Sequence, residues 1–276
     1  MDLAVQTHHW CSGDMIKMGI LEGKKGIVMG VANSRSIAWG IARKLAEQGA
    51  DLCFTYQGES LLKRIEPLAQ SINSNFILEC DVLDNDSIKN TFGNINKKWG
   101  SLDFVLHSIA FSDKNELKGK FYNTSKENFS RTMLISSFSL TEICKEAQHL
   151  MDKNGGSILT LSYIGGERTT PNYNVMGVAK AALECSVRYL SVDLGKKNIR
   201  INSLSSGPMR TLAGAAISGA RHVFRHSEKN SPLTKNPSLI EGSKSALYLL
   251  SDLSSGVTGE NHFVDGGYNI IAVPKE

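Results

Sequence analysis

The chain has 276 residues, of which 41% are hydrophobic and 21% are charged, and this ordinary globular composition excludes a disordered protein. Its 31 Lys and Arg against 27 Asp and Glu leave a formal net charge of +4, which is too small for this length to indicate a nucleic-acid-binding protein. At about 100–200 residues per domain, the length allows one large domain or two small ones.

The cysteines of the chain predict reduced thiols rather than disulfides or a zinc site. Their number, five, is odd, no two of them form a CxxC unit, and no cluster of histidines accompanies them. This usage favours the cytoplasm, where thiols stay reduced. No apolar run approaches the ~20 residues of a transmembrane helix, and no metal site is expected, even at His8 and His9. Residues 1–17 have no apolar signal core, so we expect a disordered N-terminal extension ahead of a single domain spanning residues 18–276.

From Lys25 onward, short apolar runs alternate with stretches of helical periodicity. In chain order, the expected strands cover residues 26–30, 51–56, 76–80, 103–107, 157–162, 199–203 and 262–264. The expected helices cover residues 36–49, 60–72, 85–99, 127–151, 172–195 and 239–250. Strands joined by helical crossovers form right-handed βαβ units. The sequence therefore predicts one α/β domain, with a Rossmann-type, doubly wound parallel sheet of about seven strands flanked by helices.

The turn after the first strand is a candidate phosphate-binding loop. It lacks the GxGxxG fingerprint, because Gly30 and Gly40 are its only glycines. Gly30 would let the backbone pass close to a pyrophosphate, and Ser36 would donate its hydroxyl at the N-terminus of the next helix, where the helix dipole favours anions. A glycine after a strand can also be a structural turn, but its place at the first strand–helix junction favours nucleotide binding.

The ends of the second and third strands indicate which nucleotide is bound. Gln57 is neutral and can hydrogen-bond a ribose diol, and Glu59 would repel a 2′-phosphate, although Lys63 and Arg64 follow one turn later. This pattern favours NADH over NADPH. Asp81 follows the third strand, where its carboxylate would either accept a hydrogen bond from the adenine amine or cap the next helix.

A tyrosine and a lysine form the candidate catalytic pair. Tyr173 and Lys180 are seven residues apart in the helix expected over 172–195, so they share one face, about two turns apart. A nearby ammonium group favours a phenolate, so we expect Lys180 to lower the pKa of Tyr173. Tyr163 follows a strand, at the edge where open α/β sheets bind their ligands. The alternative is an ordinary helix that happens to carry a tyrosine and a lysine on one face.

Eight segments of the chain together carry a family resemblance. They are Gly30–x5–Ser36-Ile37-Ala38, Tyr56-Gln57, Cys80-Asp81-Val82, His107-Ser108-Ile109, Leu161-Ser162-Tyr163, residues 171–177 with Lys180, residues 206–213 and Val264-Asp265-Gly266-Gly267. These segments resemble the bacterial NADH-dependent enoyl-acyl-carrier-protein reductases, a divergent branch of the short-chain dehydrogenases/reductases. The resemblance covers about residues 18–271. Its most specific feature is the wide spacing from Tyr173 to Lys180, since ordinary short-chain dehydrogenases/reductases space the pair by three residues. Thr160 stands where those ordinary members carry a serine.

The resemblance implies an activity and a set of site residues. The activity is the NADH-dependent reduction of trans-2-enoyl-acyl-carrier protein to saturated acyl-carrier protein during fatty acid elongation. The implied catalytic residues are Tyr163, Tyr173 and Lys180, and Ser112 would contact the substrate. The implied cofactor-binding residues are Gly30, Ser36, Ile37, Gln57, Asp81, Val82, Ser108, Ile109, Lys180, Met209, Arg210, Thr211, Leu212 and Ala213. Ala110 replaces the glycine of many relatives, and its methyl group would narrow the pocket without changing the chemistry.

Residues of about 207–230 are expected to form a helical lid over the substrate. Small residues dominate 213–220, so this segment would pack lightly and close over bound substrate; the alternative is a plain surface helix. Residues 207–235 hold five basic residues and one acidic residue. The net charge of this segment is therefore +4, the same as that of the whole chain. We therefore expect Arg221 and Arg225 to steer an acidic acyl carrier protein to the entrance.

The relatives form homotetramers by packing long helices together. The apolar run through Ala181, Leu183 and Val187 permits the same assembly here. Two other functions remain open at this point. One is a different short-chain reductase, acting on ketoacyl or sugar-alcohol substrates, against which the wide tyrosine–lysine spacing argues. The other is a catalytically silent dinucleotide sensor, which would have no need of the tyrosine–lysine pair.

Overall fold

The computed structural model describes residues 19–274, apart from 152–153, 212–213 and 215–217. The extension expected at residues 1–17 and the cofactor contacts expected of Leu212 and Ala213 therefore lie outside the described residues. Within the described part of the chain, no helix is both long and apolar enough to cross a membrane.

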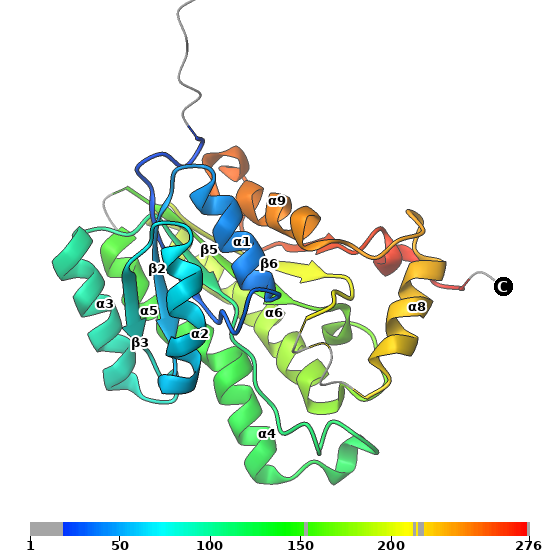
Figure 1. Cartoon of the computed structure of the whole chain (residues 1–276). Helices are drawn as coiled ribbons and strands as arrows, with labels where there is room; N and C mark the ends of the chain where they lie inside the picture. Colours follow the sequence, from blue (N-terminus) through cyan, green and yellow to red (C-terminus); the bar gives the residue numbers. More distant parts are fainter. Residues whose placement is uncertain (1–18, 152–153, 212–213, 215–217, 275–276) are drawn as a thin grey trace, which may run out of the picture.

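A seven-stranded parallel sheet forms the centre of the molecule (Figure 1), in the order β3-β2-β1-β4-β5-β6-β7. Its strands are β1 (Lys25–Met29), β2 (Asp51–Tyr56), β3 (Phe76–Glu79), β4 (Phe104–His107), β5 (Gly156–Ser162), β6 (Ile199–Ser206) and β7 (Asn261–Val264). Ile27 in β1 pairs with Cys53 in β2 on one side and with Val105 in β4 on the other. The strand order reverses between β1 and β4, and dinucleotides bind at such switch points. The expected doubly wound α/β fold is confirmed.

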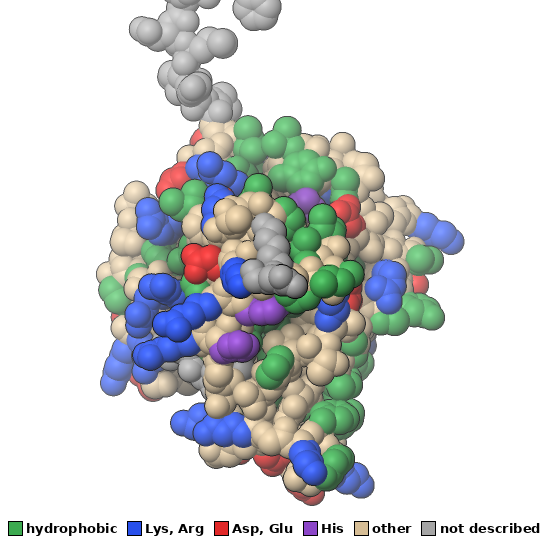
Figure 2. All heavy atoms as spheres, turned by 90° about the vertical axis from the view of Figure 1, so that its right-hand side faces the viewer, with side chains coloured by type: hydrophobic (Ala, Val, Ile, Leu, Met, Phe, Trp, Pro, Cys, Tyr) green, Lys and Arg blue, Asp and Glu red, His purple; other side chains and the backbone are tan. Residues whose placement is uncertain are grey.

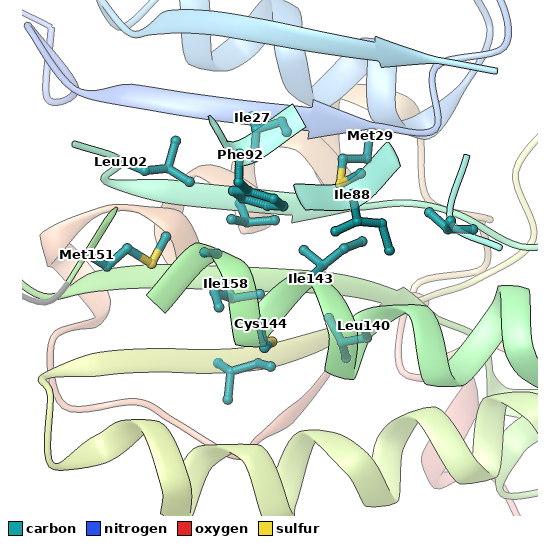
Figure 3. Close-up of a cluster of buried hydrophobic side chains, with 14 of the residues drawn as sticks. Ile27, Met29, Ile88, Phe92, Leu102, Leu140, Ile143, Cys144, Met151 and Ile158 are labelled. Carbon is teal, nitrogen blue, oxygen red and sulfur yellow. The ribbon is translucent and has the colours of Figure 1, made fainter. Parts of the chain in front are cut away.

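Helices cover both faces of the sheet (Figure 1). They are α1 (Ile37–Ala46), α2 (Glu59–Gln70), α3 (Asn85–Trp99), α4 (Lys126–Met133), α5 (Ser139–Met151), α6 (Asn174–Gly195), α8 (Ala220–Asn230) and α9 (Leu239–Leu250). One core lies between the sheet and α1, α2 and α9, and a second lies between the sheet and α3, α5 and α6. Figure 3 shows the second core, in which Ile143 and Cys144 of α5 lie with Ile27 of β1 and Ile158 of β5. The sheet is thus held between two apolar layers, and its loops are free to form a site.

Two of the expected helices differ from the observed ones. The helix expected over 127–151 is interrupted by a π-helical turn, Leu134–Phe138, between α4 and α5. The helix expected over 172–195 begins at Asn174, because Asn172 and Asn174 have φ angles of 57° and 37°. The left-handed backbone at Asn172 interrupts the expected helix, so that Asn174 becomes the first residue of α6. Tyr173 therefore caps α6 instead of lying within it.

The residues expected at a subunit interface are also placed differently. Leu183 and Val187 of α6 are completely or almost completely buried in the second core of their own chain. A side chain that faces the sheet of its own subunit is not available to a neighbouring subunit. Ala181, the third residue expected there, is exposed, as are the large apolar side chains Val178, Tyr189 and Val192 of α6.

Candidate active site

The candidate cofactor loop begins where β1 ends, beside the switch point of the sheet. Gly30 has a φ of 94°, and a Cβ atom there would lie 1.9 Å from the carbonyl oxygen of Ser108, which follows β4. Only glycine fits this left-handed, crowded position. The hydroxyl of Ser36 accepts hydrogen bonds from the backbone N–H groups of Ala32 and Asn33, both at 3.0 Å. Ser36 thereby shapes the loop from the N-cap position of α1, and its own hydroxyl proton can still be donated to an anion.

The first turn of α1 follows this loop directly, starting at Ile37. The first N–H groups of an α-helix have no partners within the helix, and the helix dipole adds positive potential there. The end of α1 beside Gly30 therefore fits a pyrophosphate.

Gln57 and Asp81 lie side by side at the ends of β2 and β3. The Gln57 amide donates a hydrogen bond of 2.9 Å to Oδ2 of Asp81, while Oδ1 of Asp81 accepts one from the N–H of Leu83. The cap of α3 is Asp84, whose side chain accepts from the N–H of Asp86. The helix-cap alternative for Asp81 is therefore wrong, and its carboxylate belongs with Gln57 at the expected nucleotide edge.

The other expected cofactor residues on this side occupy the rim of the sheet. Ser108 continues β4 by donating its N–H to the carbonyl oxygen of Met29, and Ile109 follows it with its side chain packed against the second core. The Val82 side chain is a buried member of that core, which leaves its backbone as the part that can meet a nucleotide. These residues come from two separate loops, and the loop after β4 lies directly against Gly30.

Tyr163 and Tyr173 are in contact at the end of β5. Their ring centroids are 5.0 Å apart and the rings meet edge to face, at 72°. A Cβ atom on Gly165 would lie 2.5 Å from the Tyr173 ring, so the glycine makes room for this close approach. Burial raises the pKa of both phenols above its ordinary value. Two neutral phenols in an apolar setting are well suited to donate hydrogen bonds to an oxygen that acquires negative charge.

Lys180 lies in α6, almost completely buried, and its Nζ donates a 2.6 Å hydrogen bond to the carbonyl oxygen of Leu161 in β5. Burial lowers the pKa of Lys180 to about 8, and the carboxylate of Glu184 partly opposes this shift. The expectation that Lys180 lowers the pKa of Tyr173 is wrong in this structure. Loss of hydration is the largest influence on the Tyr173 phenol, and it favours the neutral form.

Thr160 occupies the position at which ordinary short-chain dehydrogenases carry their serine. Its hydroxyl is hydrogen-bonded at 2.9 Å to Nδ1 of His107, and the Nε2 of His107 is hydrogen-bonded at 2.9 Å to Ser139. His107 is fully buried, and burial lowers its pKa to about 3, so the imidazole is neutral. Thr160 is therefore part of a hydrogen-bonded chain that ties β5 to β4 and, through His107, to α5.

The residues expected on the far side of the cofactor follow β6. Met209 is buried against α9, where a Cβ atom on Gly242 would lie 2.9 Å from its methyl carbon. The guanidinium of Arg210 lies over the ring of Phe224 in α8, 5.1 Å from the centroid, and Thr211 accepts a hydrogen bond from the N–H of Gly214. These contacts connect the end of β6 to the segment in which the lid is expected.

Ser112 lies in the loop after β4, where a substrate contact is expected. Its hydroxyl is within 3.2 Å of the amide nitrogen of Asn128, which is buried in α4. Asn128 also accepts a hydrogen bond from the N–H of Asp113. The Ser112 side chain is therefore held by α4 instead of moving freely in the loop.

Three site residues were not found from the sequence. Asn172 and Asn174 flank Tyr173 and extend to different segments: Asn172 donates to the carbonyl oxygen of Ser218, and Asn174 donates to that of Gly119. Their signal is the Asn-Tyr-Asn triplet, since asparagine tolerates left-handed backbone better than most residues. Glu184 has no comparable signal, because a glutamate in a helix is ordinarily exposed.

The outer face of α8 is basic. It carries Arg221, Arg225 and Lys229 with His222 and His226, whose rings stack 6.1 Å apart. Figure 2 looks at this side of the molecule and shows Lys and Arg side chains gathered beside histidines. Among the described residues, no group of His, Cys, Asp and Glu could hold a metal ion.

Ligands of doubly wound sheets bind at the carboxyl ends of the strands, at the switch point. Here that edge brings together a helix N-terminus, the Gln57–Asp81 pair, two tyrosines and a buried lysine. In a hydride-transferring enzyme the cofactor supplies the hydride, and protein groups such as a phenol and an ammonium orient the reactants and stabilise the charge that develops. The fold and the site therefore define an oxidoreductase of the short-chain dehydrogenase/reductase class.

Comparison with known proteins gives the family within this class. The family model described as enoyl-(acyl carrier protein) reductase matches residues 30–269, and the chain belongs to this family. It is 60% identical, over 256 residues, to the protein of Rhizobium meliloti (strain 1021) named enoyl-acyl-carrier-protein reductase (NADH) 2, and the match covers 93% of this chain and 95% of the relative.

Two solved structures are similar along nearly the whole chain. The crystal structure of FabI from Candidatus Liberibacter asiaticus superposes with a TM-score of 0.91 at 56% identity, covering 94% of this chain and 100% of the other. The enoyl-acyl-carrier-protein reductase of Anaplasma phagocytophilum, solved in complex with NAD, superposes with a TM-score of 0.90 at 51% identity, covering 94% of this chain and 98% of the other.

Proposed function

We propose that this chain reduces trans-2-enoyl-acyl-carrier protein to the saturated acyl-carrier protein with NADH, a step of fatty acid elongation. The observation that carries this proposal is the contact of Tyr163 with the buried Tyr173 at the end of β5, with Lys180 buried in the helix that Tyr173 caps. The named relatives, which are NADH-dependent enoyl-acyl-carrier-protein reductases, support the same substrate and cofactor.

The residues around the switch point fit a nicotinamide dinucleotide. The N-terminus of α1 with Gly30 and Ser36 would receive the pyrophosphate, and the neutral Gln57 would hydrogen-bond the adenosine ribose. Asp81 would accept a hydrogen bond from the adenine amine. The remaining contacts would come from Ile37, Val82, Ser108, Ile109, Met209, Arg210, Thr211, Leu212 and Ala213.

When NADH is bound, it supplies the hydride that adds to the β-carbon of the enoyl thioester. Negative charge then develops on the thioester oxygen, and the Tyr173 hydroxyl donates a hydrogen bond to it. Such a donor, held in place in a site that excludes water, typically lowers the activation barrier by about 3–4 kcal/mol. A proton from a tyrosine or from water is then added to the α-carbon, which completes the saturated thioester. Tyr163 positions the acyl chain beside Tyr173, and Lys180 binds the hydroxyls of the nicotinamide ribose.

The substrate enters between two segments that the asparagines flanking Tyr173 hold. Ser112 contacts the substrate from the loop after β4, and residues of about 207–230 close over it as a lid. The contact between Asn172 and the carbonyl oxygen of Ser218 supports this arrangement, since it joins the lid segment to the turn that carries Tyr173. Arg221 and Arg225, on the exposed side of α8, attract the acidic carrier protein.

We also propose that the chain works as a homotetramer in the cytoplasm, with residues 18–276 forming one domain and residues 1–17 an extension. Exposed apolar side chains on α4, the π turn and α6 support the assembly, since they would be covered by a second subunit. They are Phe129, Leu134, Phe138, Tyr189 and Val192. Free cysteines support the compartment. They are Cys53, Cys80, Cys144 and Cys185.

The test is an assay of NADH oxidation by the purified protein with two thioesters. Crotonyl thioester is reduced at its double bond, whereas acetoacetyl thioester is the substrate of a ketoacyl reductase. We expect loss of the reduced-nicotinamide absorbance with crotonyl thioester and none with acetoacetyl thioester. The opposite preference would assign the chain to another short-chain reductase, and binding of NADH without turnover of any enoyl thioester would make it a sensor.

A further inference from the structure

Glu184 is a buried acidic residue that the mechanism above does not use. It lies in α6 with 5% of its surface exposed, and the hydroxyl of Ser162, the last residue of β5, donates a hydrogen bond to its Oε1. A Cβ atom on Gly166 would lie 3.0 Å from the same oxygen, so the turn after β5 also closes around the carboxyl group. Burying a carboxylate in this way costs free energy unless the group is hydrogen-bonded and near an opposite charge.

Lys180 lies one helical turn before Glu184 in α6. Residues four positions apart lie on the same face of an α-helix. Lys180 donates to the carbonyl oxygen of Leu161 at 2.6 Å, and Glu184 accepts from Ser162, the next residue of β5. Two consecutive residues of β5 therefore hold two consecutive turns of α6, and the ammonium and carboxyl groups are both bound to the end of this strand.

The charges of the two groups support each other. Burial lowers the pKa of Lys180 to about 8, and Glu184 acts to raise it. Burial raises the pKa of Glu184, and both Ser162 and Lys180 act to lower it. Each group therefore favours the charged form of the other in a place where neither is well hydrated.

Other charged and titratable groups face this pair from several elements. Glu167, in the turn after β5, raises the pKa of Glu184, and Arg188, one turn further along α6, lowers it. Lys180 acts to lower the pKa of the neutral His107 of β4, and Glu184 acts to raise the pKa of Tyr173 at the start of α6. Among these groups, Glu184 is the carboxylate that acts on Lys180.

We propose that Glu184 is a positioning residue that acts through Lys180: its carboxylate, held by Ser162, keeps Lys180 charged and directed at the end of β5, where the ribose of NADH binds. This inference rests on the proposed function, in which Lys180 binds the cofactor. It assigns a role in cofactor binding to a residue that touches neither cofactor nor substrate.

The test is the affinity for NADH as a function of pH, measured without substrate by the fluorescence of NADH. The wild-type protein loses affinity as the pH rises through the value at which Lys180 deprotonates. Glu184→Gln keeps the size of the side chain but removes the charge that opposes deprotonation. In this variant we expect the alkaline loss of affinity to occur about one pH unit lower than in the wild type. Near pH 9 the variant therefore binds NADH about tenfold more weakly than the wild type does.

Two further variants complete the experiment. Glu66→Gln removes an exposed carboxylate from α2 and is expected to leave the pH profile unchanged. Ser162→Ala keeps the Glu184 carboxylate but removes the hydroxyl that holds it, so the alkaline limb moves in the same direction by a smaller amount. Ser162→Ala also decides the question if Glu184→Gln fails to fold, as judged by circular dichroism.

Profiles of the variants that coincide with that of the wild type would overturn the proposal. A purely structural role of Glu184 would lower the melting temperature without moving the pH limb, and would overturn it too. The outcome is independent of the test of the proposed function, which is read from turnover of an enoyl thioester by the wild-type protein. A wild type that binds NADH but reduces no enoyl thioester would refute the function and leave the comparison of binding profiles valid.

Discussion

Replacing Lys180 by methionine separates two effects of its buried charge, the effect on the stability of the fold and the effect on the affinity for NADH. The folded protein lowers the pKa of Lys180 from 10.5 to about 8, a difference of about 2.5 units. At about 1.4 kcal/mol per unit, holding the ammonium group in the folded state costs about 3 kcal/mol. An unfolded lysine titrates at the ordinary value, so this cost is fully present below pH 8 and disappears between about pH 8 and pH 10.5.

The same substitution removes one favourable contact. The carbonyl oxygen of Leu161 loses its hydrogen bond from Lys180, and an unsatisfied buried acceptor costs about 1–3 kcal/mol. At pH 7 we therefore expect Lys180→Met to stabilise the protein without NADH by about 1 kcal/mol, or about 2 °C in melting temperature. Its affinity for NADH falls about 10- to 100-fold, because a hydrogen bond from a charged donor contributes about 1.5–3 kcal/mol.

Thermal denaturation without NADH, together with fluorescence titration with NADH, tests both halves of this expectation. The stability advantage of Lys180→Met should shrink as the pH is raised from 7 to 10, since the wild-type protein then sheds its buried charge. Lys89→Met, at an exposed position of α3, should change neither quantity. The reasoning is refuted if Lys180→Met binds NADH as the wild type does, or if its stability relative to the wild type does not depend on pH.

Three further variants test other parts of the site. Tyr173→Phe should lower kcat about 10²- to 10³-fold with an unchanged Kd for NADH, because it removes the hydrogen-bond donor to the thioester oxygen; steady-state kinetics would contradict this role if kcat were preserved. Replacing both Arg221 and Arg225 by Glu should raise KM for the carrier-linked enoyl substrate far more than for the coenzyme A thioester, and equal increases would exclude a docking role. Gly30→Ala places a Cβ atom 1.9 Å from the carbonyl oxygen of Ser108. Denaturation should therefore show that the free energy of unfolding falls by about 1–3 kcal/mol, and titration should show at least about tenfold weaker NADH binding. A variant that kept both properties would show that this loop accommodates a side chain.

The sheet could be predicted from the sequence because parallel strands are buried on both faces. Runs such as Ile27 to Met29 are therefore continuously apolar and end in glycine, and the observed strand is fully buried from Ile27 onward. Helical crossovers between such strands then predicted a doubly wound parallel sheet. The start of α6 could not be predicted, because Asn172 and Asn174 adopt left-handed backbone that few asparagines adopt. What selects it is the contact of each side chain with another segment, and sequence periodicity carries no trace of such contacts.

The candidate site could be predicted in part for the same reason. Gln57 and Asp81 follow strands, and the carboxyl ends of neighbouring parallel strands meet at one edge, so topology alone brings the pair together. Glu184 and Ser162 meet only because α6 packs against β5 at a particular depth and rotation. In the sequence, Glu184 is simply a polar residue in a helix. Packing in three dimensions decides that it is buried.

The ionisation of Tyr173 shows most clearly where reasoning from spacing fails. The distance along a helix predicts that Lys180 is near enough to favour a phenolate, but it says nothing of how well the phenol is hydrated. Gly165 and Tyr163 close around the Tyr173 ring, and this burial raises the pKa of the phenol instead of lowering it. A phenol that keeps its proton cannot act as a base at neutral pH, but it can donate a hydrogen bond throughout the reaction. That is what the developing charge on the thioester oxygen requires, and Lys180 is then left to bind the cofactor ribose.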